Sequence, residues 1–212
     1  TRIPSSAASD VYKRQSFLQR KSSTCVEHNT LMSSDFYSYL PERAIAKCAS
    51  LIAGHKVVIH VVRTRKTKHG DFRVQPKRPV SITINAMENP YRFLLTFLHE
   101  WAHYKVFTSY TFRKKPHGKE WKSAFQQMVA PFLEGDIFPE SLLIPLKKHM
   151  QNARATFAAD ANLSMALRAF DPPNNKKCIF ELEQGALFNA QDGRVFSKDA
   201  KRRTRFVCTC VK

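Results

Sequence analysis

The spacing of apolar residues predicts helices over much of the chain. Residues 41–53 repeat apolar side chains at helical spacing and stop before Gly54. Asn89 and Pro90 form a typical helix start, with Asn89 as the cap and Pro90 in the first turn. The predicted helices are residues 41–53, 89–107, 118–133 and 139–151, with 153–170 helical in part.

Two regions have the pattern of strands instead. Residues 56–62, 72–75 and 80–85 are strand-like, and a basic segment containing glycine separates the first from the second. After the break DPPNN, short alternating pieces run from Lys177 to the end, separated by turn signals. The pattern therefore predicts an α+β fold, with helices packed on a small, mainly antiparallel sheet and a small C-terminal β module.

The same pattern divides the chain into four parts. Residues 1–20 have neither periodicity nor the apolar core of a secretory signal, and we interpret them as a non-native or disordered leader. Residues 21–150 are the main domain, 151–175 a helical segment and linker, and 176–212 the β module. The last apolar alternation has no closing turn, which favours truncation of the module at Lys212.

The chain is strongly basic. Of its 212 residues, 35 are Lys or Arg and 17 are Asp or Glu, which gives a net charge of +18. This excess favours association with nucleic acid, although solvated charges or hairpin charges that prevent edge pairing are the alternative. The candidate nucleic-acid-binding residues are Lys201, Arg202, Arg203 and Arg205.

The cysteines and the apolar runs bear on the compartment. The five cysteines include no C-x-x-C pair, which fits a reducing cytoplasm. The longest apolar runs are far shorter than the roughly 20 residues of a membrane-spanning helix. We therefore expect a cytoplasmic protein without a membrane partner.

The segment HEWAH, residues 99–103, carries the candidate chemistry. Residues four apart share a helix face, so His99 and His103 can bind one metal ion at roughly 2 Å. Glu100 lies one step around the helix, where its carboxylate can take a proton from a water molecule at that ion. The alternative is a core histidine pair without metal, which the cost of burying these polar groups disfavours.

The motif lacks the third protein ligand that catalytic zinc sites usually have. His117 is the candidate, because it precedes a predicted helix that a short turn can fold back over the first. It follows His103 by fourteen residues, too many for the compact metzincin signature. Glu120 is the alternative third ligand. The other histidines considered are expected to be surface or strand-packing residues: His60, His69 and His149.

A family resemblance is carried by the segments NPYRFLLTFLHEWAH and HGKEW, which resemble those of the SprT-like metallopeptidases, relatives of the Spartan proteases. The upstream segment ITIN resembles the strand before the active-site helix of that family. The resemblance covers about residues 35–133 and makes residues 21–150 a SprT-like domain with a compact, zincin-like core. It implies that an edge strand holds an extended substrate, that Glu100 is the general base, and that zinc is bound by His99, His103 and His117.

The C-terminal module differs from that of many SprT-like proteins. The family often carries a zinc ribbon with two C-x-x-C pairs, but this region has only Cys178, Cys208 and Cys210. A second, structural zinc is therefore not expected, and alternating cysteines on a strand are ordinary core residues. The tail resembles instead the ribbon-less tail of bacterial, Bacteroidetes-type SprT-like proteins.

Functions from two classes follow from these features. The first is a zinc metallopeptidase that cleaves proteins or peptides near nucleic acid, which the motif and the downstream His117 favour. The second is a nucleic-acid-binding protein with a structural zinc and a transcription-related or architectural role, which the charge favours and Glu100 disfavours. Hydrolysis of a non-peptide bond is left open by the motif.

Overall fold

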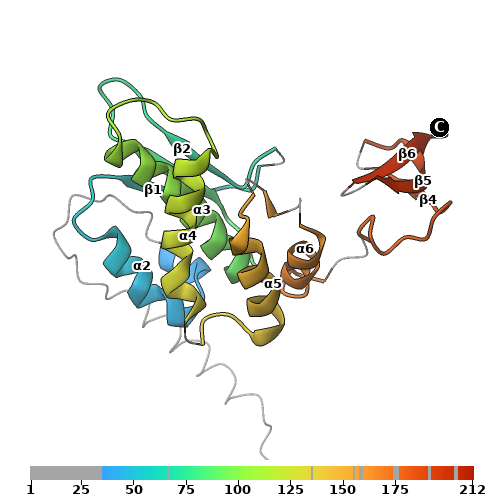
Figure 1. The fold of residues 1–212 in the computed structure, drawn as a ribbon, viewed down its shortest axis with the longest axis horizontal. Coiled ribbons are helices and arrows are strands. Elements are labelled where there is room, and N and C mark those ends of the chain that lie inside the picture. Colours follow the sequence, from blue (N-terminus) through green and yellow to red (C-terminus); the bar gives the residue numbers. More distant parts are fainter. Residues whose placement is uncertain are drawn as a thin grey trace, which may run out of the picture.

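The computed structural model describes residues 35–212 except 66, 135, 155, 158–159, 174–176, 191 and 203–204. The predicted leader at residues 1–20 lies outside this part of the chain. Figure 1 shows helices packed on a first sheet, followed by a second, C-terminal sheet that stands beside the last helix. The α+β fold predicted from the sequence is confirmed.

The first sheet has three strands and mixed pairing. Its strands are β1 (Val58–Val62), β2 (Gly70–Arg73) and β3 (Ser81–Asn85), in the order β1-β3-β2. Strand β2 pairs antiparallel with β3, whereas β1 and β3 run parallel. Along the chain, the two outer strands β1 and β2 come first and the central strand β3 comes last. This order leaves β2 at an edge of the sheet.

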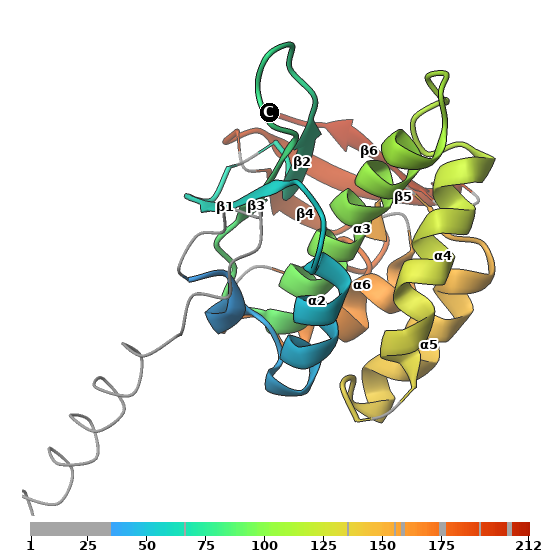
Figure 2. The ribbon, with the colours of Figure 1, turned by 90° about the vertical axis from the view of Figure 1, so that its left-hand side faces the viewer.

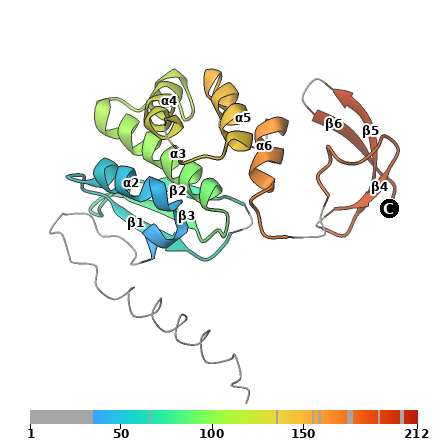
Figure 3. The ribbon, with the colours of Figure 1, turned by 90° about the horizontal axis from the view of Figure 1, so that it is seen from below.

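Helix α3 (Pro90–Ser109) carries the HEWAH motif through the middle of the fold. The side chain of Asn89 accepts hydrogen bonds from the backbone N–H groups of Tyr91 and Arg92, which confirms the predicted cap. One side of α3 packs on β2 and β3 and another on α4 (Lys119–Leu133). Figure 3 shows α3 between the sheet and α4, so the motif lies where three elements meet.

The remaining helices complete the core around α3. Figure 2 shows α2 and α4 on opposite sides of it. Large side chains from several elements are fully buried here, each worth about 1.5–3 kcal/mol of hydrophobic stabilisation; they include Phe36, Phe93, Phe97, Trp101 and Phe125. None of the described helices is both long and apolar enough to cross a membrane. The other helices are η2 (Phe36–Tyr39), η3 (Glu42–Ala44), α2 (Ile45–Ile52), α5 (Glu140–Gln151) and α6 (Ala161–Arg168).

The C-terminal sheet is the predicted β module. Its strands β4 (Leu187–Asn189), β5 (Val195–Arg202) and β6 (Arg205–Cys210) pair antiparallel in the order β4-β5-β6. The alternating piece at residues 177–183 forms turns rather than a strand, because Glu181 closes it locally: its backbone N–H donates to the Cys178 carbonyl and its carboxylate accepts from the Cys178 N–H.

Candidate metal centre

Three imidazole rings converge between α3 and the start of α4. Nε2 of His117 lies 3.1 Å from Nε2 of His99 and 3.1 Å from Nε2 of His103. His99 and His103 come from successive turns of α3, and His117 directly precedes Gly118, the N-cap of α4. In the part of the chain that the structure describes, this is the one group of three potential metal ligands with all ligand atoms within 4.8 Å of one another. The structure thus brings the three predicted ligands together.

The alternative ligand and the other histidines lie elsewhere. Glu120 is outside this group, and its carboxylate lies 4.0 Å from Nζ of Lys114. His60 and His69 are exposed. The expectation that His149 is a surface or strand-packing residue is wrong, because it lies on α5, is 3% exposed, and its Nδ1 is 3.0 Å from Oδ2 of Asp160.

The spacing and the charge of the triad fit a zinc ion. Tetrahedral coordination at about 2.0–2.1 Å separates neighbouring nitrogens by about 3.3 Å, close to the 3.1 Å observed. Burial, together with the neighbouring imidazoles, lowers the pKa of His99 to about 3 and that of His103 to about 4, and burial lowers the pKa of His117. All three rings are therefore neutral at pH 7, the form that binds metal.

His117 is held in an unusual backbone conformation. Its φ of 55° lies in the left-handed region, which costs an L-residue about 1–2 kcal/mol and is typical of functional sites. The turn is closed by a 3.0 Å hydrogen bond from the N–H of Gly118 to the carbonyl of Lys115. The Trp121 ring lies behind the triad, with its centroid 4.7 Å from that of His117 and 4.6 Å from that of His99. The loop geometry therefore directs His117 back toward α3.

The Glu100 side chain is buried against strand β2. It is 7% exposed and accepts a hydrogen bond from the backbone N–H of Phe72. Gly70 leaves room for it, because a Cβ at this position would lie 2.5 Å from Oε1 and 2.9 Å from Cδ of Glu100. The sequence pattern starts the strand at residue 72 and leaves Gly70 in the basic segment before it, so this contact was not predicted. In the structure Gly70 begins β2, and a glycine within a strand often marks such a close approach.

The pKa of Glu100 is raised to about 8 by burial and then by the Asp71 carboxylate, against the opposing effects of Arg65, the Phe72 N–H and Lys68. A cation held by the adjacent triad would favour the ionised carboxylate instead. The carboxylate and the three neutral imidazoles are thus complementary parts of one site.

The raised pKa predicts how Glu100 affects stability in the metal-free protein. The folded-state pKa of about 8 lies above the ordinary value of 4.5, so the stability associated with the protonated side chain is complete below pH 4.5 and is lost as the pH rises toward 8. The free energy of unfolding of Glu100→Gln should therefore increase relative to that of the native protein by up to a few kcal/mol between pH 5 and pH 9. Urea unfolding in EDTA measures this difference. A difference that does not change with pH would contradict the assignment.

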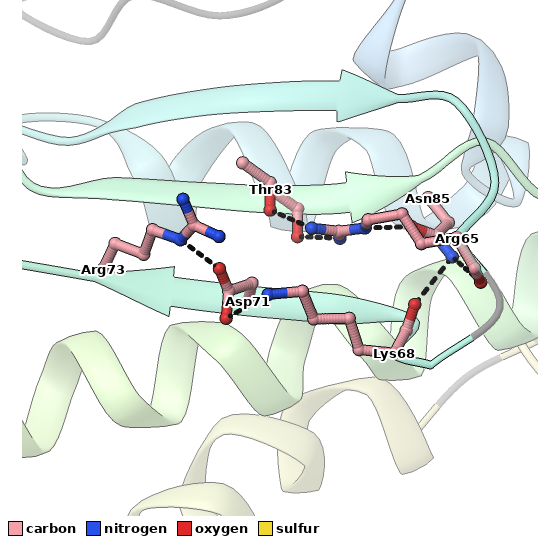
Figure 4. A network of polar contacts seen from close by, with 6 residues as sticks. All are labelled: Arg65, Lys68, Asp71, Arg73, Thr83 and Asn85. Carbon is pink, nitrogen blue, oxygen red and sulfur yellow. Dashed lines mark hydrogen bonds and ion pairs between the residues drawn. The ribbon is translucent and has the colours of Figure 1, made fainter.

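A polar network holds the loop that leads into β2 (Figure 4). Nε of Arg65 donates to Oδ1 of Asn85 at 2.7 Å, and its NH1 group donates to Oγ1 of Thr83 at 3.0 Å. The Asn85 amide donates in turn to the backbone carbonyls of Arg65 and Lys68. Nζ of Lys68 lies 3.0 Å from Asp71. Asn85 is fully buried, so its polar groups need these hydrogen bonds, which hold the loop against β3. The same bonds thereby keep β2 beside Glu100.

The triad and Glu100 open into a pocket of about 950 Å³. Strand β2 forms one side of this pocket, and the end of α3 with the loop at residues 110–116 forms another. The three histidines, which are partly exposed, are therefore accessible to a ligand from outside, and the buried Glu100 lies next to them.

The predicted nucleic-acid-binding residues that the structure describes lie where β5 ends and β6 begins, about 80 or more residues after His117 in the sequence. Lys201 and Arg202 end β5 and Arg205 begins β6, and all three are exposed. Arg203 lies outside the described residues. Nζ of Lys201 is 6.0 Å from the centroid of the Phe206 ring and Nζ of Lys198 is 4.2 Å from it, so this aromatic face is already covered by cations.

Comparison with known proteins finds one family model that matches a segment of the chain. The model of the family described as SprT-like matches residues 51–139, a range that holds the first sheet, α3, α4, the triad and Glu100. No curated protein and no solved structure matches the chain.

Proposed function

We propose that the chain is a zinc-dependent metallopeptidase that hydrolyses peptide bonds in the cytoplasm, because residues 51–139 match the model of the SprT-like family. The observation that carries the proposal is the placement of three neutral imidazoles beside a buried carboxylate, all of which line one open pocket. Structural zinc sites usually have four protein ligands, whereas this group has three among the described residues. The count favours catalysis over a structural zinc in a nucleic-acid-binding protein.

The residues of the site divide the chemistry between them. The Nε2 atoms of His99, His103 and His117 would hold the zinc ion. When bound, this ion would act as a Lewis acid that lowers the pKa of water and polarises the substrate carbonyl. Glu100 takes a proton from the attacking water molecule while the oxygen of that water adds to the carbonyl carbon. The same carboxyl group then gives this proton to the amine nitrogen as the C–N bond breaks. Strand β2, at the edge of its sheet, offers its backbone to an extended substrate.

The proposal is tested by incubating the zinc-loaded chain with an unfolded protein, such as reduced and alkylated lactalbumin, and mapping new termini by mass spectrometry. Cleavage that stops with a zinc chelator is expected. Zinc-loaded protein that cuts no unfolded protein or peptide would contradict the proposal.

Replacing Gly70 by Ala is expected to displace the Glu100 carboxylate while the fold survives. The added methyl group meets the end of a flexible side chain, which gives way before backbone does. A misplacement of about 1 Å can cost about 100-fold in rate, so kcat/KM should fall by about 10- to 100-fold with the zinc content unchanged.

A double-mutant cycle with Glu100→Asp identifies the cause of the Gly70→Ala loss. The shorter Asp side chain leaves space for the methyl group, so Gly70→Ala should cost less than about threefold in kcat/KM on that background. Equal losses on both backgrounds would show that Gly70 does not act through Glu100.

We further propose that the basic residues at the end of β5 and the start of β6 contact nucleic acid and bring the peptidase to nucleic-acid-bound proteins. The support is the exposure of Lys201, Arg202 and Arg205 together with the net charge of +18. Because Phe206 is covered by lysine side chains, we expect phosphate contacts rather than base stacking by these residues.

Salt titration of single-stranded DNA binding checks the nucleic-acid proposal. Replacing Lys201, Arg202 and Arg205 by Ala should reduce the slope of log K against log salt by about 2–3 and weaken all sequences alike. The matched control replaces three exposed lysines elsewhere, Lys56, Lys147 and Lys148. An equal effect of both triple variants would assign binding to overall charge and not to these three residues.

A further inference from the structure

Aromatic side chains line the pocket from the triad outward, and we call them the aromatic wall: Phe72, Phe107, Tyr110 and Phe112. The Phe72 ring of β2 stacks on His103, with centroids 6.3 Å apart and planes at 17°, and lies 5.9 Å from the Phe107 ring. Phe107 follows His103 by one helical turn on α3 and is 46% exposed. The wall therefore places open apolar surface one helical turn from the candidate ligands.

This exposed apolar surface is concentrated at the pocket. The described part of the chain exposes eight large hydrophobic residues, and four of these line this one pocket: Val74, Phe107, Tyr110 and Phe112. Clustered exposed apolar side chains are typical of binding sites, whereas scattered ones are ordinary. The hydrolytic chemistry assigned to the triad and Glu100 makes no use of them.

Positive charge borders the aromatic wall. Arg113, Lys114 and Lys115 line the pocket from the loop between α3 and α4, and Nζ of Lys114 lies 4.9 Å from the centroid of the Tyr110 ring. Arg113 and Lys115 are exposed, and neither forms an ion pair with any described residue.

The carboxylates that line the same pocket do not offset these cations. Asp71 is paired with Lys68 and Arg73, and the Glu100 side chain is buried. The loop between α3 and α4 therefore presents uncompensated positive charge next to the apolar surface.

We propose that the aromatic wall and the basic loop beside it together form a substrate subsite. This subsite would bind a protein segment that carries a large apolar side chain followed by acidic side chains. The apolar side chain would pack on Phe107 and Val74, and the carboxylates would meet Arg113 and Lys115. The inference rests on the proposed peptidase function. Single-stranded nucleic acid uses similar residues, but the wall adjoins the edge strand β2, whose backbone is suited to pair with a peptide.

Three labelled peptides of otherwise identical sequence test the subsite, with Phe-Glu-Glu, Ala-Glu-Glu or Phe-Lys-Lys at the same positions. Binding is measured by fluorescence anisotropy with zinc-loaded Glu100→Gln protein, and cleavage with native protein. The Phe-Glu-Glu peptide should be preferred over each of the others by about tenfold or more. Equal binding of the Glu-Glu and Lys-Lys peptides would overturn the proposal.

Two pairs of variants assign the preference to the wall. Phe107→Ala should reduce the preference for Phe over Ala, whereas Ile144→Ala, at an even more exposed apolar position on α5, should not. Arg113→Glu with Lys115→Glu should remove or invert the preference for Glu-Glu over Lys-Lys. The control Lys147→Glu with Lys148→Glu changes the net charge equally on exposed sites of α5 and should leave it within about twofold.

The outcomes separate this inference from the proposed function. Native protein that cuts none of the peptides, while the Glu100→Gln protein still discriminates among them, would refute hydrolysis and support the subsite. Equal cleavage of all three would support hydrolysis and refute the subsite. An oligonucleotide that displaces the peptide, and whose binding alone is lost with Arg113→Glu and Lys115→Glu, would assign the loop to nucleic acid instead.

Discussion

The Glu100→Gln variant should retain its zinc and lose about 100- to 10,000-fold in kcat. The amide has nearly the shape of the protonated carboxyl group, so it fits beside Gly70 and can be buried at the same place. It cannot accept the proton of the attacking water, which is the role assigned to Glu100. Steady-state cleavage of an unfolded protein and metal analysis of the same sample measure both quantities.

A matched control for Glu100→Gln is Glu120→Gln. Glu120 lies in the first turn of α4, close to the triad in sequence, but its carboxylate faces Lys114 at 4.0 Å and does not join the ligand group. Activity of this control should stay within about threefold of the native protein. Undiminished cleavage by Glu100→Gln would refute the proposed mechanism.

The His117→Gly variant should lose zinc affinity by on the order of a thousandfold while the metal-free protein stays folded. Glycine adopts the φ of 55° without strain, and this relief offsets the greater freedom of glycine in the unfolded chain. The urea stability of the metal-free variant should therefore lie within about 1 kcal/mol of the native value.

Competition with a zinc indicator measures the affinity change, with Glu120→Ala as the control that tests the alternative third ligand. The Glu120→Ala protein should bind zinc as the native protein does. A loss of affinity in Glu120→Ala but not in His117→Gly would make Glu120 the third ligand.

Local sequence predicted the part of the site that lies on one helix. Asn89 and Pro90 start α3 by chemistry that needs no tertiary contact, and the four-residue spacing of His99 and His103 places both on one face of any helix. The position of His117 followed from the need for a third ligand and a short turn, and the structure places its ring against both others.

Contacts between distant segments were not predictable in the same way. The place of Gly70 beside Glu100 depends on the edge position of β2 and on the loop that Arg65 and Asn85 fasten, neither of which leaves a periodic signal. The parallel pairing of β1 with β3 is likewise a choice of strand order. At residues 177–183 a local hydrogen bond of Glu181 overrides an alternation that favoured a strand.

Titration of zinc into the metal-free native protein, with cleavage of an unfolded protein as the readout, tests the central claim most directly. The site with its three imidazoles predicts no cleavage without zinc and activity that rises to a plateau at one zinc per chain. A chain that binds one zinc without gaining activity, or that cleaves equally well without metal, would contradict the account.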